Sequence, residues 1–287
     1  MDELRPVFII GAGRSGTKYL RDTLFASETC TRVPYDIGYV WRYGNETLDH
    51  DEIDVGNVSD KQVAWIRKHL YKLTDKDSPR PQAGILLEKS VPNSLRPLLV
   101  SRCFPKGKII QLIRNGYAVT ESAMRMWQQP PERGYLMDKI RYFPWSNYKY
   151  GLWFIRNNFV RRKNSPPPLW GPLYSGIQDD VINYPLHIVC ARQWKRCIEV
   201  AHEQLQQIPS ELQLTIRYED LMKDEEPLVE ACRFIGVSPN AVVKHWEKTV
   251  GRGNDSKWRT NLSRKQIQEV GDVFDKLPAE LKRFAFE

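Results

Sequence analysis

The chain has 287 residues, and 41% of them are hydrophobic, which is enough for the core of one large domain. Its 43 Lys and Arg residues outnumber its 35 Asp and Glu residues, so the net charge is +8 and anionic partners are favoured. The sequence has no zinc-finger spacing, no RNA-recognition motif and no continuous block of Lys and Arg, so we expect no nucleic-acid partner.

The first predicted element is a strand over residues 7–10, which leads into a glycine-rich turn over residues 11–16. Helix-compatible residues follow the turn, with leucines one helical turn apart. A strand, a glycine loop and a helix together hold phosphate groups, because free backbone N–H groups at the helix start point at the anion. Arg14 and Lys18 add positive charge, so the loop predicts a phosphate-like ligand.

The loop departs from the Walker A motif of P-loop kinases in the order of two residues. Gly11 and Gly16 have the Walker spacing, but Thr17 comes before Lys18 instead of after it. This order misplaces the lysine that reaches the terminal phosphates and the hydroxyl that binds magnesium. We therefore expect a phosphate loop of another kind and keep a P-loop kinase as an alternative.

The next predicted strand, residues 85–87, ends in Glu88-Lys89-Ser90. The ordinary pKa of a Glu side chain is about 4.3, so an ionised Glu88 can accept a proton at neutral pH. We interpret Glu88 as a general base and Lys89 as a residue that orients it or stabilises charge. His50, in an acidic segment, is the alternative base, and the sequence leaves that choice open.

A third predicted strand, residues 109–113, ends at Arg114, and a helix is expected to begin within one or two residues. Ser122 then lies two turns into that helix. An arginine fork binds a phosphate through two parallel hydrogen bonds, and a nearby hydroxyl adds one more. The two side chains are therefore chemically suited to a phosphate group.

Residues 128–185 differ in composition from the rest of the chain. Prolines and aromatic residues cluster there, and basic residues such as Arg161 and Arg162 are interleaved with them. Long irregular insertions are usually functional or disordered, and this one is too aromatic for disorder. We interpret it as an acceptor-binding lid, with residues 31–45 as the opposite wall. The alternative is a structural excursion that packs on the core.

The last two predicted strands cover residues 186–190 and 214–217, and the second runs into a helix at Tyr218. A glycine-containing basic loop follows, and it carries the cluster Lys257-Trp258-Arg259. The alternation of strands and helical stretches predicts an α/β, P-loop-type three-layer fold with a central parallel sheet flanked by helices. Ligands of such folds bind at the carboxyl ends of the strands.

Several segments of the chain resemble segments of the PAPS-dependent sulfotransferases, and they come in the same order along the chain. The resemblance is closest to the glycan and tyrosylprotein types of that family. PAPS is 3′-phosphoadenosine-5′-phosphosulfate. The segments are residues 11–17, Arg114 with Ser122, Arg-Tyr-Glu-Asp-Leu at residues 217–221 and the basic loop at residues 251–259. The resemblance covers the chain from about residue 6 to residue 262.

The chain departs from the family pattern at three places. Arg14 stands where many members have Lys, and Asn115-Gly116 stands where members often have Asp-Pro or Asn-Pro. The segment at Glu88 resembles the Glu-Lys-Ser/Thr-Pro of glycan sulfotransferases, but Val91 is inserted before the proline.

The resemblance implies a role for each matching residue. Arg14 and Lys18 stabilise charge during transfer, and Glu88 deprotonates the acceptor hydroxyl. Arg114 and Ser122 hold the 3′-phosphate, and Tyr218 lies near the adenine. The residues implied in binding PAPS, or PAP as product, are Gly13, Arg14, Ser15, Gly16, Thr17, Lys18, Tyr19, Arg114, Ser122, Tyr218, Lys257, Trp258 and Arg259.

We therefore predict one sulfotransferase domain over residues 1–287, with the insertion at about 128–185 as its lid. It is expected to move the sulfuryl group of PAPS to an acceptor hydroxyl, first of all on an anionic saccharide. The alternative acceptors are a small-molecule or lipid alcohol and, after these, a protein tyrosine. A P-loop kinase and a protein that only binds PAP or nucleic acid are the alternative functions.

Cysteine and histidine usage bears on metal binding and on the compartment. The five cysteines are scattered without a Cys-x-x-Cys pair, and the five histidines are dispersed, so we expect reduced thiols and no metal site. The first strand begins within ten residues of Met1, and no apolar run approaches the length of a membrane span. These features predict a cytoplasmic protein without a membrane span.

Overall fold

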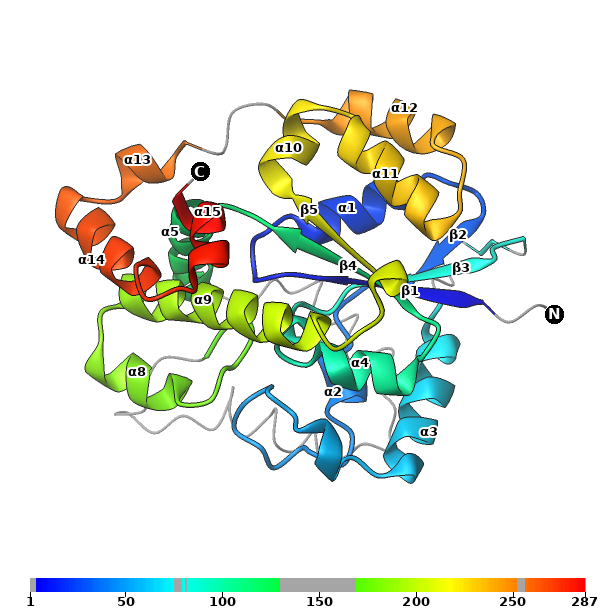
Figure 1. Cartoon of the computed structure of the whole chain (residues 1–287), viewed down its shortest axis with the longest axis horizontal. Helices are drawn as coiled ribbons and strands as arrows, with labels where there is room; N and C mark the ends of the chain where they lie inside the picture. Colours follow the sequence, from blue (N-terminus) through cyan, green and yellow to red (C-terminus); the bar gives the residue numbers. More distant parts are fainter. Residues whose placement is uncertain (1–3, 75–78, 81, 130–168, 252–255, 287) are drawn as a thin grey trace.

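The computed structural model describes residues 4–74, 79–80, 82–129, 169–251 and 256–286 (Figure 1). Its sheet has the strand order β2-β3-β1-β4-β5, and every neighbouring pair is parallel. The strands are β1 (Arg5–Ile10), β2 (Cys30–Arg32), β3 (Ile85–Glu88), β4 (Lys108–Ile113) and β5 (Gln213–Arg217). The predicted α/β fold with a central parallel sheet is confirmed.

Helices cover both faces of the sheet (Figure 1). The first half of the chain contains α1 (Thr17–Leu24), α2 (Gly38–Trp41), α3 (Asp60–Leu70), α4 (Pro97–Cys103) and α5 (Gly116–Gln128). The second half contains α8 (Ile177–Asn183), α9 (Leu186–Leu205), α10 (Tyr218–Lys223), α11 (Glu226–Ile235), α12 (Asn240–Thr249), α13 (Trp258–Asn261), α14 (Arg264–Phe274) and α15 (Ala279–Phe286). Short 3₁₀ turns lie at Val55–Asn57, Tyr71–Leu73, Val91–Leu95 and Ser210–Leu212.

The alternation of side chains along β1 shows why both faces need a cover. Val7 and Ile9 belong to the hydrophobic cluster that includes residues of α1, α11 and α12. Phe8 and Ile10 belong to the opposite cluster, with residues of α2, α3, α4 and α9. Successive side chains of a strand point to opposite faces, so an all-apolar strand is stable only between two helical layers.

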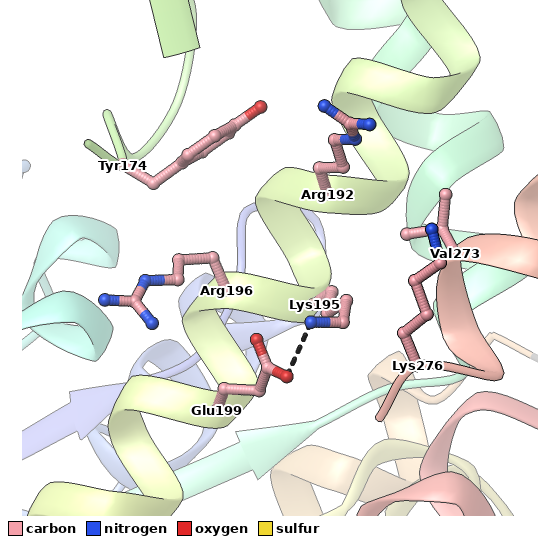
Figure 2. A pocket seen from close by; sticks show the side chains of 7 residues that line it. All are labelled: Tyr174, Arg192, Lys195, Arg196, Glu199, Val273 and Lys276. Atoms are coloured by element: carbon pink, nitrogen blue, oxygen red, sulfur yellow. Dashed lines mark hydrogen bonds and ion pairs between the residues drawn. The ribbon is translucent and has the colours of Figure 1, made fainter. Parts of the chain in front are cut away.

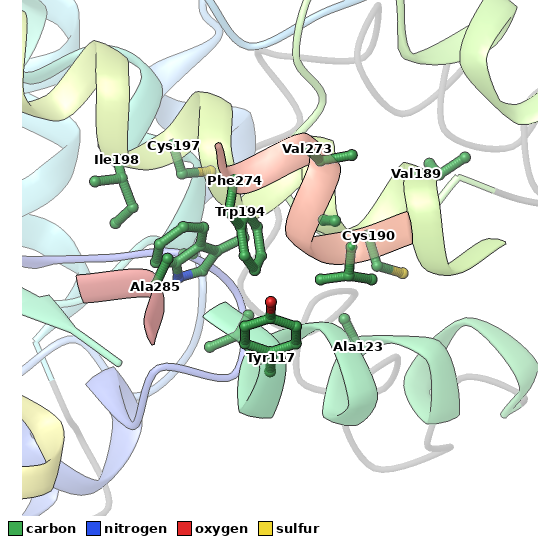
Figure 3. Packing of buried hydrophobic residues seen from close by; sticks show 14 of the residues in the cluster. Tyr117, Ala123, Val189, Cys190, Trp194, Cys197, Ile198, Val273, Phe274 and Ala285 are labelled. Atoms are coloured by element: carbon green, nitrogen blue, oxygen red, sulfur yellow. The ribbon is translucent and has the colours of Figure 1, made fainter. Parts of the chain in front are cut away.

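A third cluster packs α5 against α9, α14 and α15 at one end of the sheet (Figure 3). The Tyr117 and Phe274 rings meet edge to face with their centroids 5.3 Å apart, and the Trp194 ring lies 4.8 Å from Phe274. The indole Nε1 of Trp194 donates to the carbonyl oxygen of Arg114 at 3.0 Å. This aromatic core therefore fixes the backbone at the carboxyl end of β4.

The structure differs from the sequence expectation at two elements. The predicted strand at residues 186–190 is wrong, because these residues form the first turns of α9. Buried residues recur along that helix at helical spacing, for example at Cys190, Trp194 and Cys197. A short apolar run cannot be distinguished from the start of a buried helix by its own pattern. The edge strand β2 was not predicted.

Two further expectations concern the insertion and the membrane. Residues 130–168, most of the predicted lid, lie outside the described residues, and α8 forms within the part that follows them. Among the helices of the described ranges, none has the length and apolar character needed to cross a membrane.

Candidate functional site

The loop between β1 and α1 is held in an unusual backbone conformation. Gly16 has a φ of 88°, and a Cβ added there would lie 2.6 Å from the ring of Tyr218. At Gly11 an added Cβ would lie 2.4 Å from the carbonyl oxygen of Leu112. Arg14 is the non-glycine residue with a positive φ, 72°, in the described part of the chain. Strained residues of this kind cluster at functional sites, and the surrounding structure has to enforce them.

The same loop presents polar groups suited to an anion. The hydroxyl of Ser15 is buried and has no hydrogen-bond partner among the described residues. The first-turn N–H groups of α1 have no acceptor within the helix, and no side chain caps its start. Arg14 and Lys18 are exposed beside them. Such a helix start attracts phosphate and sulfate groups through these N–H groups and the helix dipole.

Residues from four separate segments of the chain, Arg14, Arg114, Ser122 and Tyr218, meet at this loop. The Nε of Arg14 donates to the hydroxyl of Ser122 at 3.0 Å. The Nη1 of Arg114 donates to the carbonyl oxygen of Arg14 at 3.1 Å. The Arg114 guanidinium also lies 4.5 Å from the centroid of the Tyr218 ring. Ser122 thus contacts Arg14, and Arg114 contacts the Arg14 backbone and the Tyr218 ring, so the four residues lie together at the loop.

Contacts outside this cluster hold Arg114 in place. The helix that follows it begins at Gly116, as predicted, and the Asn115 side chain caps it by accepting from the N–H of Ala118 at 3.1 Å. The backbone N–H of Asn115 donates to the buried carboxylate of Glu219 at 2.8 Å. Glu219 therefore ties β4 to the start of α10.

The basic segment after α12 is anchored to α5, the helix that carries Ser122. The Trp258 ring is buried and stacks on Tyr117 with a centroid distance of 4.6 Å. Lys257 and Arg259 on either side of it are exposed. The Trp258 ring therefore packs in the core, while the two cations beside it are exposed to solvent.

Tyr19, on α1, contacts α12. Its hydroxyl lies 3.5 Å from the hydroxyl of Thr249 on α12, and its side chain is half-buried. Thr17, the first residue of α1, is buried, and Gly13 is buried within the loop. These residues belong to the loop and its helix, as the sequence predicts.

Glu88 is fully buried at the carboxyl end of β3, which pairs with β1 so that Glu88 lies opposite Phe8. Its Oε1 accepts from Trp41 Nε1 at 3.4 Å, and its Oε2 accepts from Asn93 Nδ2 at 3.3 Å. Burial raises the pKa of Glu88 to about 7, against a partly compensating hydrogen bond from Ser90. A carboxylate with this pKa is suited to exchange a proton near neutral pH.

Lys89 and His50 have separate surroundings. The Lys89 ammonium donates to both carboxylate oxygens of Asp36, at 2.8 and 2.9 Å. His50 is half-buried, its carbonyl oxygen accepts from Arg42 at 3.0 Å, and its Nδ1 has no partner among the described residues. Lys89 is thus engaged with a carboxylate other than Glu88.

Trp170 is a site residue that the sequence interpretation did not single out. A Cβ added at Gly13 would lie 3.2 Å from the Trp170 ring, so this ring packs on the loop next to Arg14. The Gln193 amide donates to the carbonyl oxygens of Trp170 and Pro172, at 2.8 and 2.9 Å. The sequence signal was the aromatic composition of the predicted lid, but no local pattern distinguishes this tryptophan from the other aromatic residues there.

A pocket of about 280 Å³ lies along α9 (Figure 2). None of the residues that line it belongs to the loop between β1 and α1. Three of the four cations that line the pocket have carboxylate partners: Arg192 contacts Asp180 at 2.5 Å, and Lys195 contacts Glu199 at 2.6 Å. Arg196 likewise pairs with a glutamate. This pocket therefore does not contribute to the candidate site.

The described ranges contain no cluster of His, Cys, Asp and Glu that could hold a metal ion.

Comparison with protein-family models and with curated proteins finds no match. Solved structures do match. A sulfotransferase domain from the curacin biosynthetic pathway is 18% identical with a TM-score of 0.54, covering 97% of this chain and 100% of that one. The sulfotransferase domain of the Synechococcus PCC 7002 olefin synthase is 17% identical with a TM-score of 0.52, covering 97% and 98%.

A mouse sulfotransferase, SULT7A1 complexed with PAP, also matches, at 13% identity and a TM-score of 0.52, over 97% of this chain and 87% of that one. These similarities concern three proteins of different origin, and they extend over nearly the whole length of the present chain. The chain therefore has the sulfotransferase fold.

Proposed function

We propose that the protein is a sulfotransferase that uses PAPS and transfers its sulfuryl group to an acceptor hydroxyl. One observation carries the proposal: Arg14, Arg114, Ser122 and Tyr218 come from four elements and meet around the strained loop. A phosphate loop, a second arginine with a hydroxyl, and an aromatic ring suit a nucleotide with phosphates at both its 5′ and 3′ positions. One solved structure of the same fold is described as a complex with PAP.

The described residues fit PAPS at the loop. The buried Ser15 hydroxyl and the first-turn N–H groups of α1 are the donors for the 5′-phosphosulfate. When bound, PAPS supplies an activated sulfuryl group and a phosphate leaving group. Arg14 and Lys18 offset negative charge on the leaving side, and Glu88 accepts the proton of the acceptor hydroxyl on a carboxylate oxygen.

Replacing Arg114 with Ala is expected to weaken PAP binding by about tenfold or more. A hydrogen bond to a charged group such as the 3′-phosphate contributes roughly 1.5–3 kcal/mol. Binding of adenosine 5′-phosphosulfate, which lacks the 3′-phosphate, should change little. Calorimetric titration with both nucleotides measures the difference.

The matched control is Arg102→Ala, which removes a half-exposed arginine paired with Asp60 and should leave both affinities unchanged. Equal affinity of the unmutated protein for the two nucleotides would contradict the assignment of the 3′-phosphate site. Tight binding of ATP with magnesium, in preference to PAP, would instead favour the kinase alternative.

We further propose that the acceptor is an anionic saccharide. The support is the resemblance at Glu88-Lys89-Ser90 and the interleaving of cations and aromatic residues in the predicted lid. Aromatic faces stack on sugar rings, and arginine forks pair with carboxylates or sulfates. The five buried free thiols support the companion proposal that the protein works in a reducing compartment such as the cytoplasm.

The KM for a sulfated or carboxylated oligosaccharide is expected to rise several-fold between low and physiological salt, because salt screens charge-steered binding. It should rise further in the double variant Arg161→Ala/Arg162→Ala, while Arg264→Ala/Lys265→Ala, which removes two exposed cations of α14, should have no effect. Transfer of labelled sulfate from PAPS measures each KM. Rapid turnover of a neutral lipid alcohol with a salt-independent KM would overturn the saccharide assignment.

A further inference from the structure

Glu88 is the end of a buried chain of polar side chains. Its Oε2 accepts from the Asn93 amide, and the Oδ1 of Asn93 accepts from the Nε of Arg96 at 2.9 Å. The Nη1 of Arg96 then donates to Oδ1 of Asp51 at 3.2 Å. Asn93 and Arg96 are fully buried, and Asp51 nearly so. Removing one hydrogen-bond partner from such a buried group lowers the stability of the fold, because water cannot replace the missing partner.

The orientation of the Asn93 amide follows from the chemistry of its neighbours. A guanidinium can only donate hydrogen bonds, so the side of Asn93 that faces Arg96 must be the carbonyl oxygen Oδ1. The donor Nδ2 is thereby turned toward Glu88. An amide N–H favours the ionised form of a carboxyl group, so Arg96 acts on Glu88 through the orientation of Asn93.

The charges along the chain balance only when Glu88 is ionised. Arg96 and Arg42 both donate to Oδ1 of Asp51, so the two cations share one carboxylate. With the Glu88 carboxylate included, two positive and two negative charges are buried together. The nearby pair of Lys89 with Asp36 carries no net charge, although Asp36 raises the pKa of Glu88 more than Lys89 lowers it. Proton uptake by Glu88 thus leaves one uncompensated positive charge in the interior.

The far end of the chain is tied to the backbone next to the loop. The Oδ2 of Asp51 accepts from the N–H of Leu173 at 2.9 Å, and the N–H of Asp51 donates back to the Leu173 carbonyl oxygen. Leu173 lies three residues after Trp170, whose ring packs on Gly13. Asp51 is therefore held by contacts on both sides, and it can hold Arg96 in one geometry.

We propose that Asn93, oriented by Arg96, is a positioning residue that favours the ionised form of Glu88 and aims its carboxylate as the proton acceptor. This inference rests on the proposed role of Glu88 in sulfuryl transfer. Ser90 assists from the other side, because its hydroxyl oxygen accepts from the N–H of Ile37 at 3.1 Å and its own hydrogen is left for Glu88. Asn93 touches neither the loop nor the acceptor in this proposal.

The test is Asn93→Asp, which replaces the donor beside Glu88 with a second carboxylate of nearly the same shape. The pKa of Glu88 should rise by about one unit or more, because a like charge disfavours ionisation. The carbon-13 resonances of labelled Glu side chains, with Glu88→Gln to assign the signal, report this pKa without turnover. The acid limb of the pH profile of kcat/KM should move upward by the same amount, with PAP affinity and the KM for the acceptor unchanged.

Two further variants separate positioning from general destabilisation. Ser94→Ala removes a buried hydroxyl that donates to the Val91 carbonyl oxygen in the same 3₁₀ turn, so it should leave the Glu88 titration unchanged. Asn93→Ser, which leaves room for a water in place of the amide, should shift the pKa of Glu88 in the same direction by less. Thermal unfolding and PAP titration check that each variant is folded.

The unmutated protein offers a measurement that no folding defect can disturb. In nitrogen-15-labelled protein, the Asn93 side-chain amide signals should shift with a midpoint equal to the pKa of Glu88. Absence of that coupling, or an unchanged pKa of Glu88 in Asn93→Asp, overturns the proposal. If the pKa of Glu88 moves but the pH profile of kcat/KM does not, the positioning contact stands and the assignment of Glu88 as the base fails.

Discussion

Glu88→Gln is expected to lower kcat by about a hundredfold or more, the usual scale for loss of a general base. Gln keeps the shape of the side chain, but its single carbonyl oxygen can accept from only one of Trp41 and Asn93, so the melting temperature should fall while PAP affinity is retained. Single-turnover transfer of labelled sulfate to a hydroxyl acceptor measures the rate. Calorimetric titration with PAP provides the check on binding.

The same residue predicts the pH dependence of the reaction. Burial raises the pKa of Glu88 to about 7, so below that pH the carboxyl group is protonated and cannot accept a proton. Below about pH 7, kcat/KM should therefore fall tenfold per pH unit, and the Glu88→Gln variant should lack this limb. A fully active Glu88→Gln variant beside an inactive His50→Ala variant would show that His50 is the base.

Gly16→Val is expected to weaken PAP binding by about thirtyfold or more. A side chain at a φ of 88° is strained by about 1–2 kcal/mol, and its Cβ would lie 2.6 Å from the Tyr218 ring. Relieving that overlap has to displace the ring, on which the Arg114 guanidinium rests. Both effects act on the loop and the second arginine together, and 1.4 kcal/mol corresponds to a tenfold change in affinity. Calorimetry with PAP measures the loss.

Gly38→Val is the matched control for this substitution. Gly38 begins α2, and a Cβ added there meets no atom within 4 Å. The control should keep PAP affinity and should change the melting temperature little. Unaltered PAP binding by Gly16→Val would contradict the assignment of the loop as the nucleotide site.

The sequence by itself determined the layered fold and the edge of the sheet at which the candidate site lies. The apolar runs of β1 and β3 are continuous, and that of β4 is interrupted only by the buried Gln111, which is the pattern of strands buried on both faces. Their carboxyl ends carry the loop, Glu88 and Arg114, and parallel strands bring such ends to one edge. These conclusions follow from local patterns, which do not depend on which distant residues meet.

The conformation of two elements depends on their packing against the rest of the chain. Residues 186–190 have the composition of a strand, but packing of α9 against α5 and α14 selects a helix. The three-residue strand β2 has too few residues to show a period, and it exists because it pairs with β3. Local propensity is weak compared with the burial of an apolar face, so tertiary packing decides such segments.

The chemistry of the site was decided by contacts between distant residues. The bond from Arg14 to Ser122 spans 108 positions, and neither residue carries a local sign of the other. Glu88 was recognisable as a candidate base, but its raised pKa comes from desolvation by the folded interior. The hydrogen bonds of Asn93 and Arg96 arise in the same way, because a polar side chain needs such partners only once the fold has removed it from water.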